Sequence, residues 1–239
     1  MATVAHSGAA FDSEQLERRF FLGMALAIAA TVLAGFGSFA AIGISSFGAP
    51  WWVHVHGLSF LAWIGLYVTQ NLFVYRRSIE QHRRLGRIGM GLAGWMILVG
   101  LLLTPVTVGN GRFPPFFTPA FFLALDWTNI ACFAALVYAA FHFRRQTDWH
   151  RRLMLCATIC VIAPAVGRLL VLAGAMSGWS NVGDLLLYVA IAMVADWRIR
   201  GRVHPAYFWG FGAIFAMAPI IDALVAFPPF EALARSIAG

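Results

Sequence analysis

Long apolar stretches alternate with short polar turns along the whole chain, and this pattern predicts a series of membrane helices. Each stretch is close to the roughly 20 residues that an α-helix needs to cross the hydrocarbon core of a bilayer. We place seven spans, the sixth of them the shortest, at 20–43, 51–75, 87–108, 119–142, 152–174, 181–197 and 204–226. The predicted fold class is therefore an all-α integral membrane protein with seven transmembrane helices.

The segments outside these spans are short. Residues 1–19 are polar and mixed in charge, and they lack the basic start and small-residue cleavage site of a signal peptide. We expect a cytoplasmic N-terminal segment over 1–19, a transmembrane domain over 20–226 and a periplasmic tail over 227–239. Proline removes a backbone hydrogen bond and can kink a helix. The spans contain Pro105, Pro164 and Pro219.

Arginine placement predicts the orientation, because positive residues in short loops accumulate on the cytoplasmic side. On a seven-span path one side receives Arg18, Arg19, Arg76, Arg77, Arg83, Arg84, Arg87, Arg144, Arg145, Arg151, Arg152, Arg198, Arg200 and Arg202. The other side receives Arg112 and Arg235, while Arg168 lies inside a span. We therefore expect a multi-pass protein of the bacterial inner membrane with its N-terminus inside and its C-terminus outside.

Composition narrows the function classes. The chain of 239 residues is 61% hydrophobic and only 11% charged, which is too apolar for an ordinary soluble domain. Its net charge of +7 sits in arginine clusters between apolar runs, which favours a lipid bilayer rather than nucleic acid as partner. The chain has no lysine, so it cannot form the Schiff base of a retinal protein.

An internal repeat links two of the polar turns. The segment RRSIEQHRRL at 76–85 matches RRQTDWHRRL at 144–153, at an offset of 68 residues, and a looser copy begins at Arg198. The chain is thus interpreted as one lead helix followed by three helix hairpins. Membrane folds built by duplication often hold a site between their repeats.

Three segments carry a resemblance to a known group of proteins. They are HRRLGR at 82–87, HRRLM at 150–154 with the later APAVGRL at 163–169, and GRVHPAYFWG at 201–210. The chain resembles uncharacterised bacterial multi-span inner-membrane proteins with HRxLGR-type boxes. The resemblance covers most of the chain and implies a fold rather than an activity.

Ionisable residues inside spans are costly and usually face the bundle interior. Counted from the outer boundary, one layer contains His54, His56, Asp126, Arg168, Asp184 and Asp222. His54 and His56 point in roughly opposite directions on a helix, and His56 shares a polar face with Ser59, Trp63, Tyr67 and Gln70, so we take His56 as the inward histidine. Asn129 lies beside Asp126 on its helix, and Tyr188 follows Asp184 on the same face.

Three interpretations of this layer stay open. It is a structural network in which Arg168 neutralises aspartates, a periplasm-facing pocket for a small molecule or ion, or a metal site of His56 with aspartates. The residues expected to line a pocket are His56, Asp126, Asn129, Arg168, Asp184, Tyr188 and Asp222. A metal has the weakest basis, because one inward histidine is few for zinc and no metal motif occurs.

A second layer of histidines lies near the cytoplasmic ends of the spans, namely His82, His142, His150 and His204. Imidazoles supplied at one depth by different helices are what a b-type haem requires. The alternative is that these histidines anchor the interface and cap helix ends beside the arginines. We favour a polar pocket for binding, sensing or transport, with a haem protein of electron transfer or reduction as the second hypothesis and a structural subunit as the third.

Overall fold

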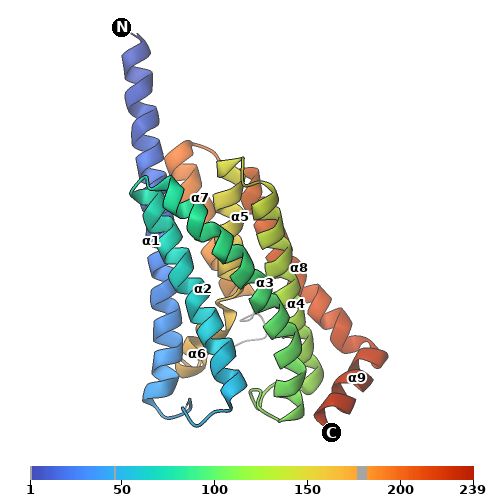
Figure 1. The fold of residues 1–239 in the computed structure, drawn as a ribbon. Helices are drawn as coiled ribbons and strands as arrows, with labels where there is room; N and C mark the ends of the chain where they lie inside the picture. Colours follow the sequence, from blue (N-terminus) through green and yellow to red (C-terminus); the bar gives the residue numbers. More distant parts are fainter. Residues whose placement is uncertain (1, 46, 177–181) are drawn as a thin grey trace.

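The computed structural model describes residues 2–45, 47–176 and 182–239, with side chains from residue 13 onward. Its described residues form nine helices (Figure 1). In chain order these are α1 (Ala2–Ala41), α2 (Trp51–Tyr75), α3 (Ile79–Gly109), α4 (Pro119–His142), α5 (Thr147–Cys160), α6 (Ala163–Leu172), α7 (Gly183–Arg200), α8 (Pro205–Ala226) and α9 (Pro228–Ala238).

The helices pack side by side as one elongated bundle (Figure 1). Helix α4 contacts α3, α5, α8 and α9, while α1 contacts α2, α6 and α7. The turns at 76–78, 143–146 and 201–204 lie at one end, which we call the arginine end. The segments at 42–45, 47–50 and 110–118 lie at the other, the loop end. The start of α1 projects beyond the arginine end, and the C-terminus lies at the loop end.

Five helices are long and apolar enough to cross a membrane: α1, α2, α3, α4 and α8. Helices α5 and α6 pass the same test only together, as one broken span, which gives up to six. Helix α7 does not pass, and its 18 residues contain Asp184, Asp196, Arg198 and Arg200. The chain is thus an all-helical membrane protein, whereas the seventh span and the orientation remain predictions. The start of the predicted sixth span, Asn181, lies outside the described residues.

The repeat is visible in the helices. Helix α3 begins at Ile79 and α5 begins at Thr147, which reproduces the offset of 68 residues between the two sequence copies. The hairpins α2–α3 and α4–α5 pack against each other through α3 and α4. Corresponding positions of the two copies are therefore brought to the same end of the bundle.

Proline acts differently at its three positions. Pro105 and Pro219 lie inside continuous helices, α3 and α8. At Pro164 the chain instead breaks, and α6 leaves α5 at an angle of 46°. The break allows α6 to approach α1 so closely that a Cβ at Gly35 would overlap the backbone of Ala165. The two backbones lie so close together that position 35 has no room for a side chain, so this crossing requires glycine.

The chain ends in an amphipathic helix rather than a loose tail. Helix α9 follows α8 directly and contacts α3, α4 and α8 at the loop end. Ala234 is buried there, and Trp127 of α4 packs edge to face against Phe230 at 6.2 Å. Residues 227–239 therefore belong to the packed fold.

Candidate functional site

In the polar layer predicted near the loop end, Asp126 is partly buried but His56 is exposed, so His56 does not face into the bundle as predicted. The Thr104 hydroxyl lies within hydrogen-bond distance of a carboxylate oxygen of Asp126 and of the carbonyl of Gly100, the latter at 2.7 Å, and its one hydrogen is shared between them. The three side chains come from α2, α3 and α4, and Thr104 is only 2% exposed. The polar side chains thus come from both repeat copies, the hairpin α2–α3 and the hairpin α4–α5.

His54 has a different role, as its opposite direction on α2 predicts. Its Nε2 lies 3.1 Å from the carbonyl oxygen of Phe47 and 3.0 Å from that of Ala49. These contacts tie the loop before α2 to the helix. Ser59, on the face of His56, accepts a hydrogen bond of 2.8 Å from Trp95 of α3.

The side chain of Asn129 forms a hydrogen bond at the break between α5 and α6. Its amide donates to the carbonyl of Cys160 at 3.0 Å, and the Cys160 thiol donates to the carbonyl of Asn129 at 3.6 Å. In an unbroken helix, the Cys160 carbonyl would accept from the backbone N–H of residue 164, which proline lacks. Asn129 therefore replaces that bond across the α4–α5 interface.

The remaining predicted residues do not join His56 and Asp126. The hydroxyl of Tyr188 lies 2.7 Å from that of Thr31, which links α7 to α1. Asp184 lies in the first turn of α7, where a carboxylate complements the helix dipole. Asp222 is exposed on α8. The layer is thus divided among several helix interfaces.

Arg168 has aromatic contacts instead of the expected aspartates. Its guanidinium lies 4.2 Å from the ring centroid of Phe36 and 5.4 Å from that of Phe39, both on α1. It also donates to the carbonyl of Pro164 on its own helix at 2.7 Å. A cation over aromatic faces gains electrostatic energy without a carboxylate, so this arginine fastens α6 to α1.

Two of the four inner histidines meet. His82 lies in the first turn of α3 and His150 in the first turn of α5, at matching positions of the two repeat copies, and their ring centroids are 6.3 Å apart in an edge-to-face arrangement. Nδ1 of His150 lies 2.8 Å from the carbonyl oxygen of Ala140. Nδ1 of His82 is buried without a hydrogen-bond partner in the described part of the chain.

The other two histidines have local roles. His142 is exposed at the end of α4 and stacks on Tyr138. His204 is the N-cap of α8, where its Nδ1 accepts a hydrogen bond of 3.1 Å from the backbone N–H of Ala206. The inner layer therefore offers one histidine pair, not four histidines around a shared ligand.

The largest polar cluster was not predicted from the sequence. It joins Glu17 of α1, Asp148, Arg151 and Arg152 of α5, and Asp196 and Arg200 of α7, and we call it the arginine clasp. Arg152 is fully buried, donates to Glu17 at 2.7 Å and forms a second ion pair with Asp196. Three arginines face three carboxylates, so the formal charges balance.

The clasp also fixes the entry to α8. The second oxygen of Asp196 accepts a hydrogen bond of 2.7 Å from the backbone N–H of His204. Arg200 adds contacts of 3.0 Å to Asp148 and 3.4 Å to Glu17. The arginine clasp could have been predicted from Glu17 and Asp196. Each is an acidic residue within three positions of an arginine at the end of an apolar span. From the sequence alone, those arginines by themselves predict only the topology.

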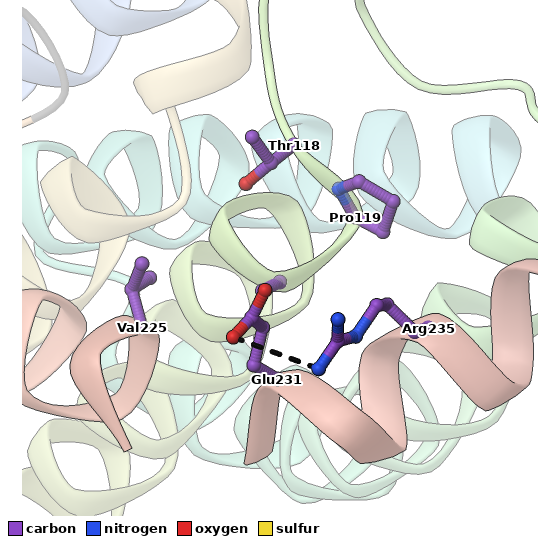
Figure 2. Close-up of a pocket in the computed structure, with 6 residues that line it drawn as sticks. Thr118, Pro119, Val225, Glu231 and Arg235 are labelled. Atoms are coloured by element: carbon purple, nitrogen blue, oxygen red, sulfur yellow. Dashed lines mark ion pairs between the residues drawn. The ribbon is translucent and has the colours of Figure 1, made fainter. Parts of the chain in front are cut away.

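The surface hollows lie away from these clusters. A hollow of about 330 Å³ at the loop end is lined by Thr118, Pro119, Ala120, Val225, Glu231 and Arg235 (Figure 2). Figure 2 shows Glu231 and Arg235 side by side on α9, joined by an ion pair of 3.8 Å. A second, open hollow is formed by Phe208, Trp209, Gly212 and Ala213 on α8. Within the described residues, no group of three or more His, Cys, Asp or Glu side chains is placed to hold a metal ion.

Comparisons of the chain with protein families, with curated proteins and with solved structures find no match.

Proposed function

We propose that this membrane protein binds and moves a small ion or small polar molecule at a site built around His56 and Asp126. The supporting observation is that a carboxylate on α4 and a buried threonine hydroxyl on α3 are joined by a hydrogen bond inside the bundle, with the exposed His56 on the neighbouring helix α2. Ionisable groups at membrane depth usually mark an ion or substrate pathway. Asn129, Tyr188 and Arg168 hold other helix interfaces of the bundle together.

We further propose that the chain belongs with the bacterial inner-membrane proteins that carry HRxLGR-type boxes. The arginine end then faces the cytoplasm, following the positive-inside rule. The site of His56 and Asp126 lies toward the loop end and opens to the periplasm in this orientation.

A stability screen tests the proposed site. Purified protein in detergent is heated with a panel of small cations, anions and amino acids, and a ligand of this site raises the melting temperature. Asp126→Asn and His56→Gln abolish that rise, whereas His54→Gln, on the other face of α2, retains it. A ligand that stabilises all three variants equally binds elsewhere and contradicts the proposal.

A second candidate is a haem protein of electron transfer, favoured by the meeting of His82 and His150 from the two repeat copies. The carbonyl of Ala140 orients His150 as backbone carbonyls orient metal-binding histidines. Neither of the two hollows described above lies at this pair. An absorption spectrum of the purified protein decides the matter: a Soret band that is lost in His82→Ala and His150→Ala supports haem.

A further inference from the structure

The inward face of α2 carries buried polar atoms that lack protein partners. Trp63, Tyr67 and Gln70 follow one another at spacings of four and three residues and so share one face. Trp63 is 1% and Tyr67 4% exposed. The indole N–H of Trp63, the hydroxyl of Tyr67 and the side-chain carbonyl of Gln70 form no hydrogen bond with the described part of the protein.

The helices opposite this face contribute more atoms of the same kind. The hydroxyls of Tyr207 on α8 and Thr128 on α4 are buried and also without a partner among the described residues. Tyr207 is fully buried on α8, which packs against α4 and α5. Buried polar groups are bonded in more than nine cases of ten, and ordered water is the usual partner when protein is not.

The row continues in both directions. Toward the loop end the same face of α2 carries Ser59 and then His56, which is exposed, while Asp126 lies on α4. Toward the arginine end the backbone of Gln70 contacts His82, whose ring meets that of His150. From His56 to Gln70 the helix rises about 21 Å, at 1.5 Å per residue, within a hydrocarbon core of about 30 Å. Polar groups thus extend along most of the membrane thickness.

We propose that this row is a hydrated proton pathway between His56–Asp126 and His82–His150. Water molecules bond to Trp63, Tyr67, Gln70 and Tyr207 and form a chain along α2. A proton released by Asp126 passes to the first water, each water accepts one proton and donates another, and a ring nitrogen of the histidine pair takes up the last. One proton enters and one leaves, so no other atom is transferred and no electron moves. The inference rests on the proposed site, whose ion is then the proton.

A flux measurement tests the pathway. The protein is reconstituted into liposomes that contain a pH-sensitive dye, and a potassium gradient with valinomycin supplies the driving potential. The parent protein should carry protons, and Tyr67→Phe and Gln70→Leu should lower the rate at least tenfold. Tyr75→Phe removes the same hydroxyl from an exposed position of the same helix and should leave the rate unchanged.

The outcomes separate the pathway from the site. Flux that is lost in His56→Gln and Asp126→Asn but kept in Tyr67→Phe and Gln70→Leu overturns the pathway and leaves the site. A ligand that stabilises the parent through His56 and Asp126, in a protein without proton flux, also overturns the pathway alone. Flux that is unaffected by all four changes overturns both.

A direct search for the water needs no variant. Pulsed X-ray irradiation of the intact protein generates hydroxyl radicals from bound water, which oxidise the side chains beside it. Trp63 and Tyr67 should be labelled despite their burial, whereas Phe133, which packs on Trp63 at 5.2 Å and is equally buried, should not. Equal and negligible labelling of all three would show a dry interior and overturn the proposal.

Discussion

The side-chain amide of Asn129 donates a hydrogen bond of 3.0 Å to the carbonyl of Cys160, taking the position of the N–H that Pro164 lacks. One asparagine on α4 thereby compensates for the break between α5 and α6. Without it, the carbonyl would lie unpaired inside the bundle, which costs about 1–3 kcal/mol.

The first prediction follows from this bond. Asn129→Ala should lower the free energy of unfolding by about 1–3 kcal/mol, while Asn110→Ala, which removes an exposed amide from the end of α3, should have little effect. Pro164→Ala restores an N–H for Cys160, so Asn129→Ala should cost less in that background. A double-mutant cycle of melting curves measures the difference, and strictly additive losses would show that the two residues act separately.

Gly35 provides a second prediction. Gly35→Ala should destabilise the protein by about 1–3 kcal/mol or more, because the new methyl group would overlap the backbone of Ala165. Gly37→Ala lies on the same helix with nothing within 4 Å of the new methyl group, and it should be neutral or slightly stabilising. Thermal unfolding in detergent compares the two. Equal melting temperatures would mean that α6 moves away from α1 without cost.

The arginine clasp can be tested against its own repeat copy. Arg152→Ala removes a fully buried cation from Glu17 and Asp196 and should cost about 3–5 kcal/mol. Arg84 occupies the matching position in the first copy, where it pairs with Glu80 on an exposed surface. Arg84→Ala should therefore cost less than about 1 kcal/mol. Chemical unfolding measures both losses of stability. Similar losses for Arg152→Ala and Arg84→Ala would contradict the prediction.

His204 should make stability depend on pH. Burial, and next the charge of Arg152, lower the pKa of its imidazole, against the opposing effect of Asp148 and Asp196. The folded protein then binds this proton less readily than the unfolded chain, so stability falls as pH drops below about 6.5. Protonation also removes the lone pair that caps α8. His204→Asn keeps a capping oxygen and should flatten the loss between pH 7 and 5 in melting curves; an unchanged slope would assign the loss to other groups.

Reporter fusions test the orientation. Fusions within residues 78–86, 146–150 and 199–203 should report the cytoplasm, and a fusion at residue 239 should report the periplasm, because most arginines lie in the first three segments and their flanks. An alkaline phosphatase fusion that is inactive at residue 239 would contradict a C-terminus outside the cell. It would mean that the number of spans is even, most simply because α7 does not cross the membrane.

The helices could be predicted from the sequence because their signal is local. Apolar runs of sufficient length and the residues at turns determine where α2, α4 and α8 begin and end, and the predicted spans at these helices agree with the structure to within one residue. The repeat was visible for the same reason. A kink at Pro164 was also expected, although its angle was not.

Side-chain partners could not be predicted in the same way, because they depend on how each helix is rotated. Arg168 lay at the depth of three aspartates, yet α6 turns it toward Phe36 and Phe39. Arg84 and Arg152 occupy identical positions in the two copies, and only the packing of α1 and α7 around α5 distinguishes a surface residue from a buried one. Tertiary contacts alone decide such cases.

The clasp also bears on the order in which the chain assembles during synthesis. Glu17 is made early, and Arg152 follows 135 residues later. At about 5–20 residues per second the ribosome needs on the order of 10 s for that interval, and Asp196 and Arg200 emerge later still. The first helix therefore enters the bilayer with its carboxylate unmatched at the membrane surface. It can be locked only when the fifth and seventh helices arrive, so the earliest helix made is among the last to become fixed.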